Sequence, residues 1–533
     1  MSVRRFAVTL LLAPSLALAQ GRFEISFPAA AHAGPVTGRV YVAVTRIADS
    51  ARGTPIEQTG ETGAPLFGVD VSALAPGARA VIDANAFGHP VRSVRDLPAG
   101  EYLMQPFVNV YTRFARADGH TVWLHMDRWE GQNWKRSPGN LFGAPVRVRW
   151  DPRSATPVRL VADRVIPPVQ VPPDDERVKR IRIRSAILSK WWGQPIEFGA
   201  TVLLPRGYEQ HPEARYPVVY EHGHFSLAAP GRYGRDTAFT RWWNAEGTPR
   251  MLLVTLQHPS PYYDDSYAVD SENNGPYGEA ITKELLPEVE RRFRAIGQPW
   301  ARLLTGGSTG GWISLAHQVF YPELYGGVWS LCPDAVDFRY HQIVNVYADT
   351  NAYWFDHGWM RVDRPTRRRP DGNILAMMKD ENWFELAVGD RSRSGGQWDI
   401  WEATFSPVGP DGYPRRIWDK TTGVIDHAVA ARWKERYDLR HILETNWATL
   451  GPKVADKLNV YIGEDDSYYL DNAAHLLHDF LRTTTNPTWT GEFVFQPGAP
   501  HCWGPPRSEL LTKMATAAER NAPAGGDVRS WKY

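Results

Sequence analysis

A single serine stands between two pairs of glycines in the stretch LLTGGSTGGW, residues 303–312. Apolar residues flank this stretch on both sides, which is typical of a buried strand followed by a helix. Where a strand turns sharply into a helix, the residues two positions before and after the turn must lack side chains, and G-x-S-x-G at 306–310 meets that need. No lysine follows the glycines, which excludes a P-loop. The pattern therefore predicts that Ser308 projects its hydroxyl as a nucleophile.

A serine nucleophile needs a histidine as base and a carboxylate that orients the histidine. On a strand–turn–helix of this kind the carboxylate follows the serine along the chain, and the histidine comes last. His501 follows the strand GEFVFQ and is the only histidine beyond His478, so it is the predicted base. The carboxylate is expected after the strand LNVYI, where four acidic residues lie close together: Glu464, Asp465, Asp466 and Asp471. The residues alone leave the choice among these four open.

Acyl transfer at a serine also needs two backbone N–H groups that bind the developing oxyanion. One is expected from Thr309, and the other from the loop EHGHFS, in which His224 or Phe225 would present its N–H. The spacing His222-x-His224 is also compatible with metal binding, but the sequence shows no obvious carboxylate partner, so a metal site is disfavoured. Neither a metal nor an organic cofactor is predicted.

These residues fall on strands that alternate with helices, which is typical of a parallel α/β sheet. The expected strands are FGATVLLPRGY, RYPVVYEHGHF, RMLLVTLQH, WARLLTGG, GGVWSLCP, LNVYIGEDD and GEFVFQP. The pattern assigns residues 179–333 and 458–533 to one α/β domain. The alternation lapses over residues 334–457, which are rich in tryptophan, and this segment is predicted to be a cap inserted above the sheet.

The N-terminal part of the chain has a different pattern of apolar and polar residues. Short alternating runs such as GRVYVAVTRI are separated by glycine and proline, which predicts a β-sandwich accessory domain over residues 20–150. Two Pro-Pro pairs and an acidic run follow in VIPPVQVPPDDE. Because proline blocks both helices and central strands, residues 151–178 are predicted to be an extended linker.

Longer motifs around these residues resemble the putative-esterase family of α/β-hydrolases, which includes esterase D, feruloyl esterases and enterochelin esterases. The motifs are VLLPRGY…YPVVYEHGHF, ELLPEVERRF, LLTGGSTGGWISLAHQVFYPELYGGVWSLCPDAVDF and VYIGEDDSYYLDNAAHLLHDFL. They cover residues 180–340 and 445–505. The resemblance implies an α/β-hydrolase fold and the hydrolysis of carboxylic esters, often of acyl groups on sugars or phenolics.

The same resemblance assigns roles to individual residues. It maps the nucleophile to Ser308, the base to His501 and the acid to Asp466, with Asp465 as the second choice. The chain departs from the family at Thr309, where Met or Leu is usual, and in the length of the inserted segment. Because the oxyanion donor at Thr309 is a backbone group, this change is expected to tune the site rather than remove it.

The chain has two cysteines, Cys332 and Cys502. Cys502 directly follows His501, and Cys332 ends the strand after the nucleophile's helix. Some feruloyl esterases carry a disulfide beside the catalytic histidine, and this resemblance predicts a Cys332–Cys502 disulfide that pins the His501 loop. The alternative is two buried thiols.

Substrate specificity is expected to depend on the tryptophan-rich cap and on the loop YYDDSYAVDSENNGPYG. The residues predicted to contact substrate are Tyr267, Trp354, Trp398 and Trp503, although core packing is the simpler interpretation for most tryptophans of the cap. The same residues are compatible with an acyltransferase or with an inactive carbohydrate-binding protein. The family resemblance disfavours a serine peptidase.

Composition and the N-terminus limit the partners and the location. The chain has 533 residues and a formal net charge of +1, so no basic face for nucleic acid is implied. Arg4 and Arg5 precede an apolar run that ends in the small-residue motif ALA, which predicts a signal peptide over residues 1–19 and export to the periplasm or the extracellular space. A short membrane anchor is the alternative. No other segment is expected to cross a membrane, and the oligomeric state is not predicted.

Overall fold

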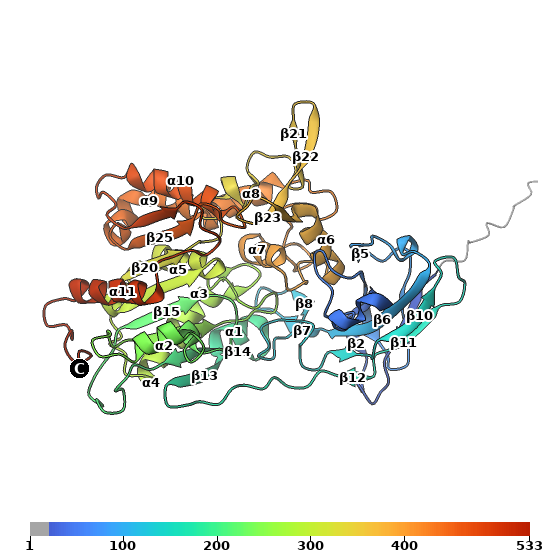
Figure 1. Cartoon of the computed structure of the whole chain (residues 1–533), viewed down its shortest axis with the longest axis horizontal. Helices are drawn as coiled ribbons and strands as arrows, with labels where there is room; N and C mark the ends of the chain where they lie inside the picture. The colour runs from blue at the N-terminus through green and yellow to red at the C-terminus, as the bar shows by residue number, and fades with distance from the viewer. Residues whose placement is uncertain (1–20) are drawn as a thin grey trace, which may run out of the picture.

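An eight-stranded sheet forms the centre of the computed structural model, which describes residues 21–533 (Figure 1). The predicted signal peptide, residues 1–19, lies outside the described residues. The strands follow the order β13-β14-β16-β15-β19-β20-β25-β26, and β13–β14 and β14–β16 pair antiparallel whereas the other pairs are parallel. Their bounds are β13 Val178–Ser185, β14 Ile196–Leu203, β15 Val218–His222, β16 Leu252–Gln257, β19 Arg302–Gly307, β20 Gly327–Leu331, β25 Leu458–Gly463 and β26 Phe493–Gln496. This is the sheet of an α/β-hydrolase.

Helices connect and cover these strands. The helix α5, Thr309–Phe320, packs against β15, β19 and β20, and its residues 309–319 are all buried. The remaining helices around the sheet are α1 Ala186–Trp192, α2 Thr237–Trp243, α3 Tyr277–Ala280, α4 Leu286–Arg292, α10 Leu470–Arg482 and α11 Arg507–Asn521. A π-helical segment, Ile281–Leu285, joins α3 to α4, so the two form one continuous but irregular helix. No helix within residues 21–533 is long and apolar enough to cross a membrane.

Two sheets of the N-terminal region share one apolar core. A three-stranded sheet has the order β11-β1-β4, and a larger sheet has the order β12-β9-β6-β2-β3-β5 with β10 paired to β6. The bounds are β1 Phe23–Ser26, β2 Val36–Arg46, β3 Leu66–Leu74, β4 Ala80–Ile82, β5 Gly88–His89, β6 Gly100–Val110, β9 Leu141–Phe142, β10 Val146–Trp150, β11 Val158–Val161 and β12 Arg164–Val165. Side chains from both sheets, including Phe23, Val42 and Met104, belong to the same buried cluster. The strands β11 and β12 lie within the range 151–178, so the extended connection begins only after Val165.

The N-terminal region packs tightly on the rest of the chain. The hairpin of β7 (Thr112–Ala115) and β8 (Thr121–Leu124) contributes Phe114 to the apolar core of the eight-stranded sheet, 5.1 Å from the ring of Trp192. On the other side, the Tyr41 hydroxyl donates a hydrogen bond of 2.5 Å to the carbonyl of Val388.

Residues 332–457, called the 332–457 segment below, run between the adjacent strands β20 and β25. Their elements are β21 Trp354–His357, β22 Met360–Asp363, β23 Pro365–Arg368, β24 Ile374–Met377, α6 Met378–Val388, α7 Gln397–Phe405, α8 His427–Tyr437 and α9 Leu439–Val454. The β21–β22 hairpin projects from the top of the molecule, and α6 and α7 lie between the hydrolase sheet and the N-terminal region (Figure 1). The tip residue Trp359 is fully exposed.

Candidate active site

Ser308 lies at the turn between β19 and α5. Its backbone has φ 57° and ψ −122°, a conformation that L-residues rarely adopt. Neighbouring backbone leaves no space for side chains on either side: a Cβ at Gly306 would lie 2.4 Å from the carbonyl oxygen of Gly310, and one at Gly310 would lie 2.0 Å from that of His222. The glycines are therefore required by close backbone approach, as the sequence pattern indicates.

His501 and Asp466 meet at the ends of neighbouring strands. His501 follows β26, Asp466 follows β25, and His501 Nδ1 lies 2.7 Å from Asp466 Oδ2. Asp466 is fully buried, and its other oxygen accepts the N–H of Tyr468 at 2.8 Å. With Nδ1 donating to the carboxylate, the Nε2 atom of His501 is left as an acceptor. Of the alternative acids, Asp471 forms an ion pair with Arg368, 3.7 Å between the nearest atoms, and burial raises the pKa of Asp471 to about 6.

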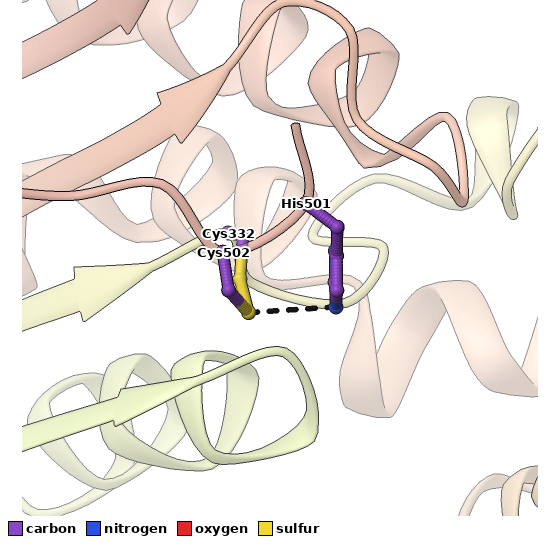
Figure 2. Close-up of side chains that lie close together, drawn as sticks. All are labelled: Cys332, His501 and Cys502. Carbon is purple, nitrogen blue, oxygen red and sulfur yellow. Dashed lines mark hydrogen bonds between the residues drawn. A yellow bond between two sulfur atoms is a disulfide. The ribbon is translucent and has the colours of Figure 1, made fainter. Parts of the chain in front are cut away.

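A disulfide joins Cys332, just after β20, to Cys502. Cys502 Sγ lies 3.4 Å from His501 Nε2, so the bond reaches the histidine directly (Figure 2). The backbone N–H of Ser308 also lies 3.2 Å from Cys332 Sγ. The covalent bond thus holds the His501 loop against the turn that carries Ser308.

Asp334 is a site residue that the sequence analysis does not identify. It is 5% exposed, and its carboxylate accepts hydrogen bonds from Ser308 Oγ at 3.3 Å, Thr309 Oγ1 at 3.1 Å and the Tyr267 hydroxyl at 2.5 Å. Burial raises its pKa, and the hydrogen bond from Tyr267 opposes that shift. Within residues 21–533 no hydrogen bond joins Ser308 to His501, because the serine hydroxyl points to Asp334. The sequence feature that could have identified Asp334 is its position two residues after Cys332, just beyond the end of a parallel strand.

Tyr267, a predicted substrate contact, is hydrogen-bonded to Asp334 and is not part of the cavity wall described below. It is fully buried, and its hydroxyl accepts hydrogen bonds from the side chains of Gln397 and Trp401 while it donates to Asp334. Of the other predicted substrate contacts, only Trp398 lines the cavity described below. Trp354 belongs to the β21–β22 hairpin, where Arg361 stacks on its ring, and Trp503 packs against the apolar core. Sequence cannot distinguish these cases, because an aromatic side chain suits a core as well as a cleft.

A cavity of about 540 Å³ opens above Ser308. Three parts of the chain form its wall. The α/β domain contributes Ser308, His501, Tyr468, Tyr263 and His224, and the 332–457 segment contributes Asp334, Gln342, Arg367, Glu381, Phe384, Gln397, Trp398 and Trp401. Glu61 reaches the cavity from the N-terminal region. The wall therefore combines aromatic rings with charged groups of both signs.

Of the predicted oxyanion donors, His224 lines this cavity and Thr309 directly follows Ser308. Thr309 is the first residue of α5, so its N–H has no partner within the helix and lies at the positive end of the helix dipole. His224 and Phe225 lie in the loop after β15, and the Phe225 ring packs edge-on against Trp129, 5.2 Å between ring centroids. His222 instead turns into the core, 4.9 Å from the His317 ring, where burial lowers its pKa.

His224 is paired with two carboxylates. Its Nδ1 lies 3.1 Å from Asp264 Oδ1 and 3.4 Å from Asp265 Oδ2. Burial lowers the pKa of the imidazole, but the two carboxylates outweigh that effect and raise it to about 11. The carboxylate partners that the sequence did not reveal thus come from the loop after β16, 40 residues further along the chain.

Residues 194–420 match the family model described as putative esterase. This part of the chain is similar to the putative-esterase family. The matched range contains Ser308 and ends before Asp466 and His501. With its nucleophile turn, the protein is a serine carboxylic ester hydrolase.

Solved structures of serine hydrolases are distantly similar. A ferulic acid esterase is 15% identical with a TM-score of 0.38, and the match covers 64% of this chain and 97% of that one. An S-formylglutathione hydrolase from Agrobacterium tumefaciens is 14% identical with a TM-score of 0.35, covering 64% and 95%. A fluorophosphonate-binding serine hydrolase from Staphylococcus aureus is 15% identical with a TM-score of 0.36, covering 63% and 97%. No curated protein matches the chain.

Proposed function

We propose that the protein is an exported esterase in which Ser308, His501 and Asp466 act as a catalytic triad. The observation that carries the proposal is the 2.7 Å contact between His501 and Asp466, on the cavity that Ser308 also lines. A buried carboxylate on Nδ1 fixes the tautomer in which Nε2 is free to accept a proton. The order of the three residues along the chain agrees with that of α/β-hydrolases.

Catalysis then begins with a rotation of the Ser308 side chain. Its Oγ turns from Asp334 to His501 Nε2, which takes the proton as Oγ attacks the ester carbonyl. Asp466 stabilises the imidazolium that forms. The N–H of Thr309, at the start of α5, and the N–H of His224 or Phe225 bind the oxyanion. The protonated His501 releases the alcohol, and water then releases the acid from the acyl-enzyme.

The cavity wall supports acylated sugars or phenolic esters as substrates. Trp398, Trp401 and Tyr468 present aromatic rings, which suit the flat face of a phenol or the apolar face of a sugar. Arg367 and Glu381 add a hydrogen-bond donor and an acceptor for hydroxyl groups.

The remaining predictions complete the proposal. Residues 20–150 act as a β-sandwich accessory domain, and residues 334–457 act as the cap that selects the substrate. The signal-like segment at residues 1–19 directs the protein to the periplasm or outside the cell. A disulfide between the only two cysteines suits an oxidising compartment.

Ester hydrolysis by the mature protein and by Ser308→Ala tests the triad. The panel contains p-nitrophenyl acetate, methyl ferulate, acetylated xylan and a catecholate-siderophore ester. We expect Ser308→Ala and His501→Ala each to lower kcat by about four to six orders of magnitude. Ser508→Ala, a serine on α11, serves as the control and should be fully active. A folded wild-type protein that hydrolyses none of these esters would contradict the proposal, and acylated sugar formed in the presence of acceptor would identify a transferase.

A further inference from the structure

Two loops bring three metal-binding side chains together beside the cavity. His224 follows β15, and Asp264 and Asp265 follow β16. One ligand atom from each residue lies within 4.8 Å of the others. Another His-containing cluster, at His501, is closed to metal because Cys332 and Cys502 are bonded to each other.

The spacing of these atoms suits a single metal ion. His224 Nδ1 lies 3.1 Å from Asp264 Oδ1 and 3.4 Å from Asp265 Oδ2. Ligands that each lie about 2.0–2.2 Å from one metal, at tetrahedral or octahedral angles, are about 3.0–3.6 Å apart. Two of the three pairs of atoms therefore already lie at the separation that coordination requires, and the third pair lies within 4.8 Å.

An unsatisfied oxygen points independently to a ligand. The side chain of Asp265 is 1% exposed, and its Oδ1 accepts the N–H of Tyr267 at 2.9 Å. Its Oδ2 has no hydrogen-bond donor among residues 21–533 and faces the imidazole of His224. A buried carboxylate oxygen without a donor is costly, and a second carboxylate nearby adds to the cost. A metal ion that displaces the proton from His224 Nδ1 gives this oxygen a partner and balances the charge of both carboxylates.

We propose that His224, Asp264 and Asp265 form a binding site for a divalent transition-metal ion such as Zn²⁺ or Mn²⁺. One imidazole and two carboxylates suit these ions, whereas Ca²⁺ prefers oxygen ligands alone. His224 and Tyr263 line the cavity, so the remaining coordination positions are open on that side. The ion would join the loop that carries the oxyanion donors His224 and Phe225 to the loop after β16, and so hold these N–H groups in place.

Metal titration tests this site without any ester. The mature protein is treated with chelator, dialysed and titrated separately with Zn²⁺ and Mn²⁺ by calorimetry. We expect one equivalent of metal to bind, with affinity at least tenfold weaker in Asp265→Asn and in Asp264→Asn. Asp118→Asn is the matched control: His120 Nδ1 lies 3.2 Å from Asp118, but Arg116 already neutralises that carboxylate. This variant should bind metal as the wild type does.

The outcomes separate this site from the proposed esterase activity. Wild-type protein that binds neither ion, or Asp264→Asn and Asp265→Asn variants that bind as tightly as wild type, would overturn the proposal. Circular dichroism shows whether Asp265→Asn folds. If it does not, Asp264→Asn decides, because the Asp264 side chain is 25% exposed and its replacement disturbs less of the core. Ester hydrolysis does not enter into this test, so either proposal can fail alone.

Discussion

Glu61 and Arg367 form an ion pair, 2.6 Å between Oε2 and Nη2, that joins the N-terminal region to the 332–457 segment at the cavity. Both side chains are about one-third exposed, at 31% and 30%. The carbonyl of Glu61 is held in turn by His89 Nε2 at 2.5 Å. The N-terminal region therefore forms part of the cavity wall. An accessory domain remote from the site would not contact the cavity.

Replacing Glu61 should change the binding of large substrates. Glu61→Gln keeps the side-chain size but weakens the bond to Arg367, so the guanidinium loses its fixed position. We expect KM for methyl ferulate or acetylated xylan to rise about three- to tenfold, in keeping with the loss of one charged hydrogen bond. The kcat for p-nitrophenyl acetate should not change. Glu101→Gln breaks an exposed ion pair with Arg147, outside the cavity, and should leave both substrates unaffected. An equal change for small and large esters would contradict this prediction.

Reducing the disulfide should lower activity. Cys502 neighbours His501 in sequence and contacts its ring, so breaking the bond to Cys332 frees the loop that carries the base. We expect kcat to fall at least tenfold in the presence of a phosphine reductant, and the free energy of unfolding to fall by about 2–5 kcal/mol. A Cys332→Ala/Cys502→Ala variant should be less active from the start and insensitive to reductant. Free-thiol titration of the denatured protein without reductant gives the independent check, since two thiols would show that no disulfide forms.

Removing the Tyr267 hydroxyl should loosen the support beneath Ser308. Tyr267→Phe leaves Asp334, Gln397 and Trp401 without a shared hydrogen-bond partner in a buried position. We expect the free energy of unfolding to fall by about 1–3 kcal/mol and kcat to fall about tenfold with little change in KM. Tyr340→Phe, on an exposed tyrosine, is the control. A Tyr267→Phe enzyme with higher KM and unchanged kcat would indicate a direct substrate contact instead.

Local patterns in the sequence were enough to predict the strand–turn–helix at Ser308. Its glycines are required because a side chain would clash with nearby backbone. The motif alone therefore predicts the geometry of the turn. His501 followed from chain order, and Asp466 needed the family resemblance, because four acids near one strand end look alike in a sequence. The structure places Asp466 against His501 because the loops after β25 and β26 are adjacent in the sheet.

Contacts between distant segments could not be predicted. Asp334 and Tyr267 form a hydrogen bond because their loops lie at one edge of the sheet. Neither residue belongs to a local sequence pattern that predicts this contact. Glu61 reaches the cavity from a domain that the sequence presents as separate. The buried tryptophans of the 332–457 segment illustrate the same limit, because hydrophobicity alone does not tell a cavity wall from a core.

The stability of the protein should also depend on the ionisation of Glu381. Burial raises its pKa to about 7, the carboxylate of Glu61 adds to the shift, and hydrogen bonds from Trp398 and Thr366 oppose it. Because the folded-state pKa lies above the ordinary value of 4.5, the stability that the neutral acid contributes is fully present below about pH 4.5 and is lost as the pH rises through 7. Glu381→Gln stays neutral throughout, so the melting temperature of the wild type should fall relative to that of the variant between pH 5 and pH 8.

Thermal melts of both proteins at half-unit pH intervals measure this difference directly. Other buried acids, including Glu402 with a pKa raised to about 7, titrate over the same range in both proteins and cancel in the comparison. Glu435→Gln, which replaces a glutamate that is 66% exposed, should follow the wild type at every pH. A constant offset between wild type and Glu381→Gln from pH 5 to pH 8 would show that Glu381 is already ionised at pH 5 and that the cavity is better solvated than its lining indicates.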